Sequence, residues 1–207
     1  KAEDKMLERI VAIKAPKEEM GQTDLILQAK QQASLNHPNL IQVYSINPDP
    51  LFVVLEYADG GSLRSIAQDN PQTYGAVSRV AKDCIDALTY IHSRNPKRLH
   101  LDLKPENILL SDSTFKLTDG LFMREGLIYE GSMSSPKLAG TPAYASPEQK
   151  GRLDKENIKL DERSDIWSFG MMLYEMATGR VLEAGETVRD NLAGNGVEFA
   201  RIIDKCL

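Results

Sequence analysis

Five polar residues of the chain are of the types that phosphoryl transfer requires. Lys14 follows an apolar run, Asp119 follows a short strand-like stretch, and Asp102, Lys104 and Asn107 lie close together between them. A cation can hold phosphate groups, oxygen ligands can hold Mg²⁺, and a carboxylate can accept the proton of a hydroxyl. Taken singly, such a lysine is usually a surface residue and such an aspartate a turn residue. Only their order and spacing together make the pattern specific.

The composition predicts a soluble, folded chain. Its 207 residues are 42% hydrophobic and 27% charged with a net charge of -5, unlike a disordered protein. The longest apolar run, at residues 51–55, is too short to cross a bilayer. No basic stripe is visible, so no nucleic-acid partner is expected. Two distant cysteines, Cys84 and Cys206, fit a reducing compartment rather than a disulfide framework.

Apolar periodicity divides the chain into two parts that would position these residues. The first part has the pattern of a small sheet with one helix, with strands expected at 10–13, 40–46 and 51–57 and the helix at 24–35. The second part is mainly helical. It has helices expected at 71–93, 165–177 and 197–207, short strands at 108–110 and 115–117, and a long loop at about 120–144.

Six segments, in this order, resemble the motifs of eukaryotic-type protein kinases. They are the lysine strand at 11–14, the hinge between lobes at 55–63, the catalytic loop at 100–107, the metal-binding segment at 116–119, the end of the activation segment at 141–148 and the start of the large central helix at 164–170. Lys104 and Thr141 resemble the residues of Ser/Thr kinases rather than those of tyrosine kinases. The resemblance covers nearly the whole chain.

The resemblance implies an α+β, two-lobed protein-kinase-like fold. Residues 1–57 would form an N-lobe with a small antiparallel sheet and one helix, and residues 58–207 a larger, mainly helical C-lobe. The family's Gly-rich loop would precede Lys1, and its last helices would follow Leu207. We therefore expect a segment of a longer chain with additional domains, which would be unstable or unable to bind ATP alone.

The resemblance also assigns roles in transferring the γ-phosphate of ATP to protein substrates. Asp102 would meet the substrate hydroxyl, and Lys104 would neutralise the moving phosphoryl group. Lys14 would hold the phosphates, while Asn107 and Asp119 would bind Mg²⁺.

Other residues would bind the adenine or support the loop. Ala12 and Leu109 would sandwich the ring, Glu56 and Ala58 would offer hinge backbone groups, and Leu55 would be the gatekeeper. Asp165 would hold the catalytic loop from below, although it could instead be a plain helix cap, and His100 would pack beneath that loop.

Four positions depart from the family pattern. Gln28 stands where a glutamate pairs with the strand lysine, so Lys14 would be held more loosely or would take Asp119 as its partner. Gln32 and Gly120 replace apolar and aromatic members of a stack between helix and active site, which predicts an easily displaced helix. Leu101 replaces an arginine that grips a loop phosphate, so activation should not depend on phosphorylation of Ser132, Ser134, Ser135 or Thr141.

Two functions remain open from the sequence. The first is an ATP- and Mg²⁺-dependent protein serine/threonine kinase, because Lys14, Asp102, Lys104, Asn107 and Asp119 are all present. The second is a pseudokinase that binds nucleotide or acts as a scaffold. The cysteine usage and the need for ATP predict a cytoplasmic location.

Overall fold

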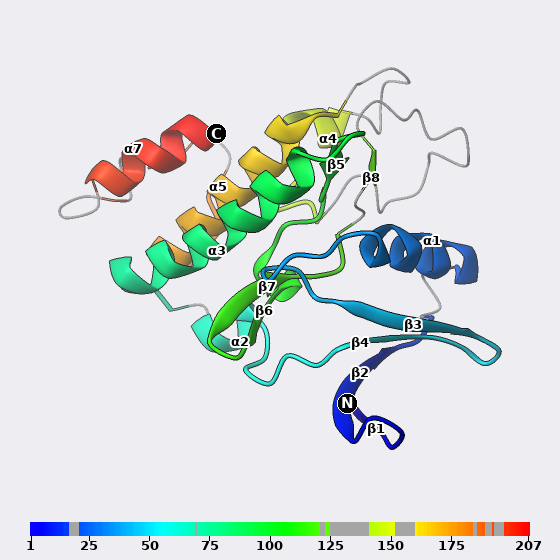
Figure 1. Ribbon diagram of the computed structural model, residues 1–207. Helices are drawn as coiled ribbons and strands as arrows, with labels where there is room; N and C mark the ends of the chain where they lie inside the picture. Colours follow the sequence, from blue (N-terminus) through cyan, green and yellow to red (C-terminus); the bar gives the residue numbers. More distant parts are fainter. Residues whose placement is uncertain are drawn as a thin grey trace.

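The computed structural model describes residues 1–16, 21–68, 70–120, 123–124, 141–151, 160–183, 186–188, 192 and 197–207. Ser132, Ser134 and Ser135 therefore lie outside the described residues. The described chain has a sheet with one helix at its N-terminal end and a larger, mainly helical part (Figure 1).

The N-terminal sheet is antiparallel and has the strand order β1-β2-β4-β3. Its strands are β1 (Ala2–Asp4), β2 (Arg9–Lys14), β3 (Val43–Pro48) and β4 (Leu51–Glu56). Alternation along β4 turns Val53 and Leu55 inward, where they pack against Leu25 and Ala29 of α1 (Gln22–Ala33). This packing holds the single helix against the sheet.

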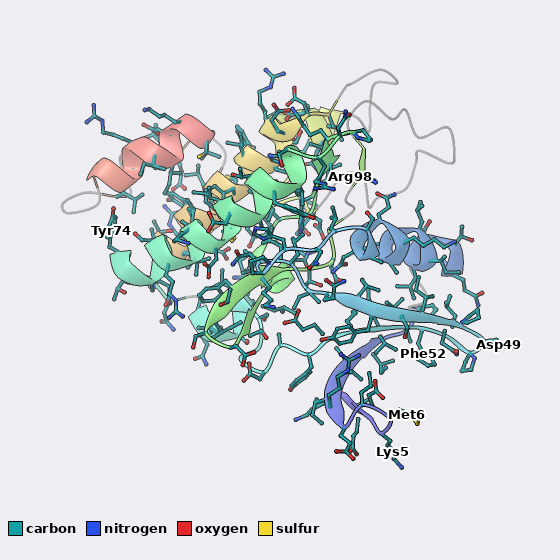
Figure 2. All side chains as sticks on the ribbon, in the orientation of Figure 1. Lys5, Met6, Asp49, Phe52, Tyr74 and Arg98 are labelled. Atoms are coloured by element: carbon teal, nitrogen blue, oxygen red, sulfur yellow. The ribbon has the colours of Figure 1, made fainter. Side chains whose placement is uncertain are left out.

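The turns of this sheet point away from the helical part. Figure 2 shows Lys5 and Met6 at the turn between β1 and β2, and Asp49 near the turn between β3 and β4. The Met6 side chain is almost fully exposed. The N-terminal part therefore meets the rest of the chain through α1 and the inner ends of its strands.

The helical part is built around α3 (Tyr74–His92) and α5 (Glu162–Thr178), which lie side by side (Figure 1). Buried residues of α3 recur every three or four positions from Val77 to Ile91, as one helix face requires. The Thr73 side chain accepts a hydrogen bond from the Ala76 N–H and begins that helix. Shorter helices surround this pair: α2 (Leu63–Ala67), α4 (Pro147–Gly151) and α7 (Val197–Cys206).

Two small two-stranded sheets follow α3 along the chain. One is the hairpin of β6 (Ile108–Ser111) with β7 (Thr114–Leu117), and the other pairs β5 (Arg98–Leu99) with β8 (Met123–Arg124), which are far apart in the sequence. Backbone hydrogen bonds join β7 to residues 39–41 ahead of β3 and join β6 to Gly60 and Gly61 after β4. A Cβ on Gly60 would lie 2.7 Å from the Leu110 side chain, so this close approach requires glycine.

The expected fold class is confirmed: a small antiparallel sheet with one helix precedes a mainly helical part. The expected helix at 165–177 begins earlier, at Glu162, because the Asp161 side chain caps it at the Arg163 N–H. Five elements that the sequence did not predict are all five residues or shorter: β1, β5, β8, α2 and α4. No helix among the described residues is both long and apolar enough to cross a membrane.

Candidate active site

The catalytic loop rests on one buried carboxylate. Asp165 of α5 is fully buried and accepts hydrogen bonds from the His100 N–H at 2.8 Å and the Leu101 N–H at 2.7 Å. Its Oδ2 also lies 2.7 Å from His92 Nε2. The cap of α5 is Asp161, so Asp165 is not a plain helix cap. Two backbone donors held by one carboxylate define the path of the loop ahead of Asp102.

Leu101 shows why this loop needs such support. Its φ of 63° is in the left-handed region, which is costly for a residue with a branched side chain. The side chain is buried, and the Leu101 carbonyl oxygen accepts a hydrogen bond from Gln149 Nε2 at 2.9 Å. The backbone is thus fixed on both sides by α4 and α5. A buried leucine here also gives no anchor to a phosphate.

The β6–β7 hairpin places the two predicted metal ligands at the same end. The 3₁₀ turn η1 (Pro105–Asn107) leads into β6, where Ile108 pairs with Leu117 of β7. Beyond that pair, the Thr118 N–H donates to the Asn107 carbonyl oxygen at 2.9 Å. Asn107 and Asp119 are therefore neighbours across the open end of the hairpin, although they are far apart in sequence.

Asp102 is the centre of a closed cluster of hydrogen bonds. Its Oδ2 lies 3.0 Å from Lys104 Nζ and accepts from Asn107 Nδ2 at 2.9 Å. Its Oδ1 accepts from Thr141 Oγ1 at 3.1 Å, and that hydroxyl in turn accepts from Lys104 Nζ at 2.7 Å. The Thr141 hydroxyl thus ties the end of the activation segment to both residues. Phosphorylation of Thr141 would break this tie.

Lys14 of β2 has two partners, one on α1 and one on the segment that follows β7. Its Nζ is 2.7 Å from Asp119 Oδ1 and donates to Gln28 Oε1 at 3.0 Å. The prediction that Lys14 takes Asp119 as its partner agrees with this geometry. The expected looser hold does not, because Lys14 has an anionic and a neutral acceptor at once.

The expected easy displacement of α1 is also not supported. Gln28 Nε2 donates to the Asp119 carbonyl oxygen at 2.9 Å and to that of Gly120 at 3.2 Å. One turn further on, the buried Gln32 Nε2 donates to the Ile41 carbonyl oxygen at 2.8 Å. Hydrogen bonds from α1 take the place of the apolar stack that the two glutamines and Gly120 interrupt.

The His100 ring leaves no space for a side chain at Gly120. A Cβ at this position would lie 2.6 Å from His100 Cδ2, so no larger residue fits without movement. His100 is fully buried, and its Nδ1 accepts from the Asp102 N–H at 3.3 Å. Burial lowers the pKa of His100 from its ordinary value of 6.5, although nearby Asp165 and Asp102 act in the opposite direction. The imidazole is therefore neutral and supports both Gly120 and Asp102.

The predicted adenine-lining residues meet at the base of the N-terminal sheet. Ala12, Ala58 and Leu109 all pack against the cluster that contains Val53 and Leu55. The Glu56 N–H already donates to the Gln42 carbonyl oxygen at 2.9 Å, so this N–H is in use without a ligand. The Glu56 side chain is fixed elsewhere, with Oε1 2.5 Å from Lys116 Nζ.

An ionic network that the sequence did not predict lies beside the catalytic loop. Arg64 of α2 contacts Glu106 Oε1 at 2.8 Å, Glu175 Oε1 at 2.6 Å and the Tyr144 hydroxyl at 2.6 Å. The same hydroxyl donates to Glu175 Oε2 at 2.6 Å, and burial together with that carboxylate raises the pKa of Tyr144 above its ordinary range. The sequence shows that Arg64 is opposite in charge to Glu106 and Glu175, but nothing in the spacing of these residues indicates that they meet.

The comparison with known families decides the identity of the fold. The model of the family described as "Protein kinase domain" matches residues 1–205. The chain belongs to the protein kinase domain family. The resemblance predicted from the six motifs is thereby confirmed, and the family in general uses ATP and Mg²⁺.

Several curated proteins are similar to this kinase domain. It is 33% identical to "Serine/threonine-protein kinase pak-2" of Caenorhabditis elegans. The matched region covers 83% of this chain and 34% of that protein. It is 34% identical to "Serine/threonine-protein kinase PAK mbt" of Drosophila melanogaster over 86% of this chain and 27% of that protein. "Serine/threonine-protein kinase max-2" of C. elegans is 32% identical over 93% and 30%, respectively. The chain thus spans about a third or less of these relatives' length.

Proposed function

We propose that this domain is a protein serine/threonine kinase that transfers the γ-phosphoryl group of ATP to hydroxyl groups of protein substrates. The observation that carries the proposal is the closed cluster of Asp102, Lys104, Asn107 and Thr141. It places a carboxylate and an ammonium group together on a rigid loop. The names of the similar proteins point to the same reaction and give no support to a pseudokinase.

The residues of this cluster fit distinct parts of the transfer. A carboxylate oxygen of Asp102 accepts the proton of the substrate hydroxyl. At the same time, the oxygen of that hydroxyl forms a bond to the γ-phosphorus. The bond from that phosphorus to the bridging oxygen of ADP breaks at the same time. Lys104 neutralises charge on the moving group, and Thr141 orients both side chains. When ATP is present, Lys14 gives up its contact with Asp119 and binds the phosphates instead.

The donor set near the hairpin end suits Mg²⁺. Asp119 offers a carboxylate, and Asn107 offers its amide oxygen because its Nδ2 donates to Asp102. Such oxygen donors, completed by phosphates and water, are what Mg²⁺ prefers. When bound, the ion would neutralise charge on the phosphates of ATP.

The adenine would lie between the two lobes, residues 1–57 and 58–207. Ala12 and Leu109 would cover its faces, and the backbone of Glu56 and Ala58 would meet its edge. Both cysteines carry free thiols, which fits the predicted cytoplasmic location. The protein substrate and any additional domains of a longer chain are further parts of the proposal.

A transfer assay with a matched pair of variants tests the proposal. The intact protein is incubated with Mg²⁺ and γ-labelled ATP beside Asp102→Asn and a control, Asp112→Asn. Asp112 is an exposed turn residue with a φ of 46°, a conformation that asparagine tolerates. We expect label on serine or threonine with the wild type and the control, and none with Asp102→Asn. ATP binding without transfer by the wild type would contradict the proposal.

A further inference from the structure

Gln28 of α1 uses both ends of its side-chain amide, one toward β2 and the other toward the segment that follows β7. Its Oε1 accepts from Lys14, and its Nε2 donates to the carbonyl oxygens of Asp119 and Gly120. The three distances lie between 2.9 and 3.2 Å, so both ends of the amide are used. A primary amide has two N–H donors, and each finds one acceptor here.

A carboxylate at this position could not make the same contacts. An ionised glutamate only accepts hydrogen bonds, so its oxygens would face two carbonyl oxygens with no proton between them. It would also place a second carboxylate beside Asp119, with Lys14 as the cation between them. The gain of a stronger bond to Lys14 would therefore be opposed by two lost donors and by charge repulsion.

The direction of the donors matters for function. Asp119 has a φ of 57°, in the left-handed region, so its backbone conformation needs support from its surroundings. The Gln28 amide donates to the carbonyl oxygens of two consecutive residues, Asp119 itself and Gly120 after it. It thus holds the backbone that aims the Asp119 carboxylate, independently of whether Lys14 is present.

We propose that Gln28 is a positioning residue whose amide nitrogen fastens α1 to the metal-binding segment. The neutral amide, and not the glutamate typical of the family, is then the residue that this site requires. The catalytic part of the inference rests on the proposed kinase function, whereas the mechanical part concerns the protein without any ligand. Lys14 is a secondary partner that can leave for the phosphates without releasing α1.

Hydrogen–deuterium exchange of the intact, ligand-free protein separates the donor contacts from the Lys14 contact. Gln28→Met removes all three contacts of the amide, whereas Lys14→Met leaves both donor contacts of Gln28 in place and removes the contact at Oε1 together with the ion pair to Asp119. We expect the amides of α1 to exchange about tenfold faster in Gln28→Met, as the loss of two hydrogen bonds implies, and at the wild-type rate in Lys14→Met. Gln22→Glu, an exposed change on the same helix, is the control and should leave exchange unaltered.

The opposite pattern would overturn the inference. Faster exchange of α1 in Lys14→Met, or unchanged exchange in Gln28→Met, would show that the donors do not hold the helix. In the transfer assay, Gln28→Glu should have a lower kcat than the wild type at saturating ATP, and a higher kcat would equally overturn it. If the wild type transfers no phosphate, the proposed function fails while the exchange comparison still decides the role of Gln28. If Gln28→Glu does not fold, the Met variants decide it.

Discussion

The molecule orients two carboxylates in different ways. One is Asp102 of the catalytic loop, and the other is Asp119 at the α1 junction, the contact of Gln28 and Lys14 with residues 119–120. Asp102 lies in a cluster that also holds Lys104, Asn107 and Thr141, and the loop ahead of it is fixed by the buried Asp165. Asp119 instead depends on one amide from a helix of the other lobe and on a lysine. The first region keeps Asp102, Lys104 and Asn107 and departs from the family pattern at Leu101. The second keeps Lys14 and Asp119 but has Gln28 and Gly120 where the family has other residues. The chemistry can thus stay constant where its geometry is local, while the link between lobes is rebuilt with different side chains.

The largest effect should come from the catalytic loop itself. Asp102→Asn keeps the shape of the side chain but removes the base, so transfer should fall by about 10²–10⁴-fold. The thermal unfolding midpoint should change little because Asn107 and Thr141 can still bond to the amide. Single-turnover rates and melting curves measured on the same preparation check both parts. A large loss of stability would show instead that the cluster is primarily structural.

Replacing Asp165, the carboxylate beneath this loop, should lower the stability of the fold and not only the rate of transfer. Asp165→Asn replaces one of the two buried carboxylate oxygens, which accept from backbone N–H groups, by an NH₂ donor. We expect the free energy of unfolding to fall by about 3 kcal/mol. Denaturant unfolding measures it. Asp161→Asn is the matched control on the same helix: asparagine also caps helices, and the lost pairing with Arg163 is exposed, so the change should be within about 0.5 kcal/mol. Equal losses in the two variants would contradict the role of Asp165.

A smaller loss should follow from crowding where the two regions meet. Gly120→Ala places a methyl group against the His100 ring and should destabilise the fold by about 1–3 kcal/mol. Gly75→Ala, at an exposed position of α3 with open space around it, should instead stabilise by about 0.5–1 kcal/mol. Denaturant unfolding of both variants, of His100→Ala and of the Gly120→Ala/His100→Ala double variant measures the coupling. Additive losses in the double variant would argue against the contact.

The smallest effect is a pH dependence that the same histidine should introduce. The pKa of His100 is lowered in the folded protein, so the unfolded chain binds its proton first as the pH falls. Stability should therefore be unaffected above pH 6.5 and decrease below it, by at most about 1.4 kcal/mol per pH unit. His37 has a lowered pKa for the same reason, burial, and adds to the trend. His100→Gln should flatten the profile between pH 7 and 5.5, and an unchanged slope would contradict the neutral, buried imidazole.

Sequence reasoning reached the catalytic loop because its residues are neighbours in the chain. Asp102, Lys104 and Asn107 lie within six positions in a segment that resembles the kinase catalytic loop, so the resemblance predicts that they meet. The α1 junction could not be predicted in the same way, because Gln28 contacts a backbone about ninety positions away. A glutamine has no spacing rule that distinguishes a lost ion pair from a pair of new donors. Arg64 illustrates the same limit, since its partner Glu175 lies on a helix far along the chain.

Single-turnover phosphoryl transfer at saturating Mg-ATP tests the central claim most directly. The intact wild type is compared with Asp102→Asn and Gln28→Met in one experiment. If the catalytic loop performs the chemistry and the amide only positions Asp119, Asp102→Asn should lose at least about a hundredfold and Gln28→Met about tenfold. Transfer by Asp102→Asn at the wild-type rate would contradict the account.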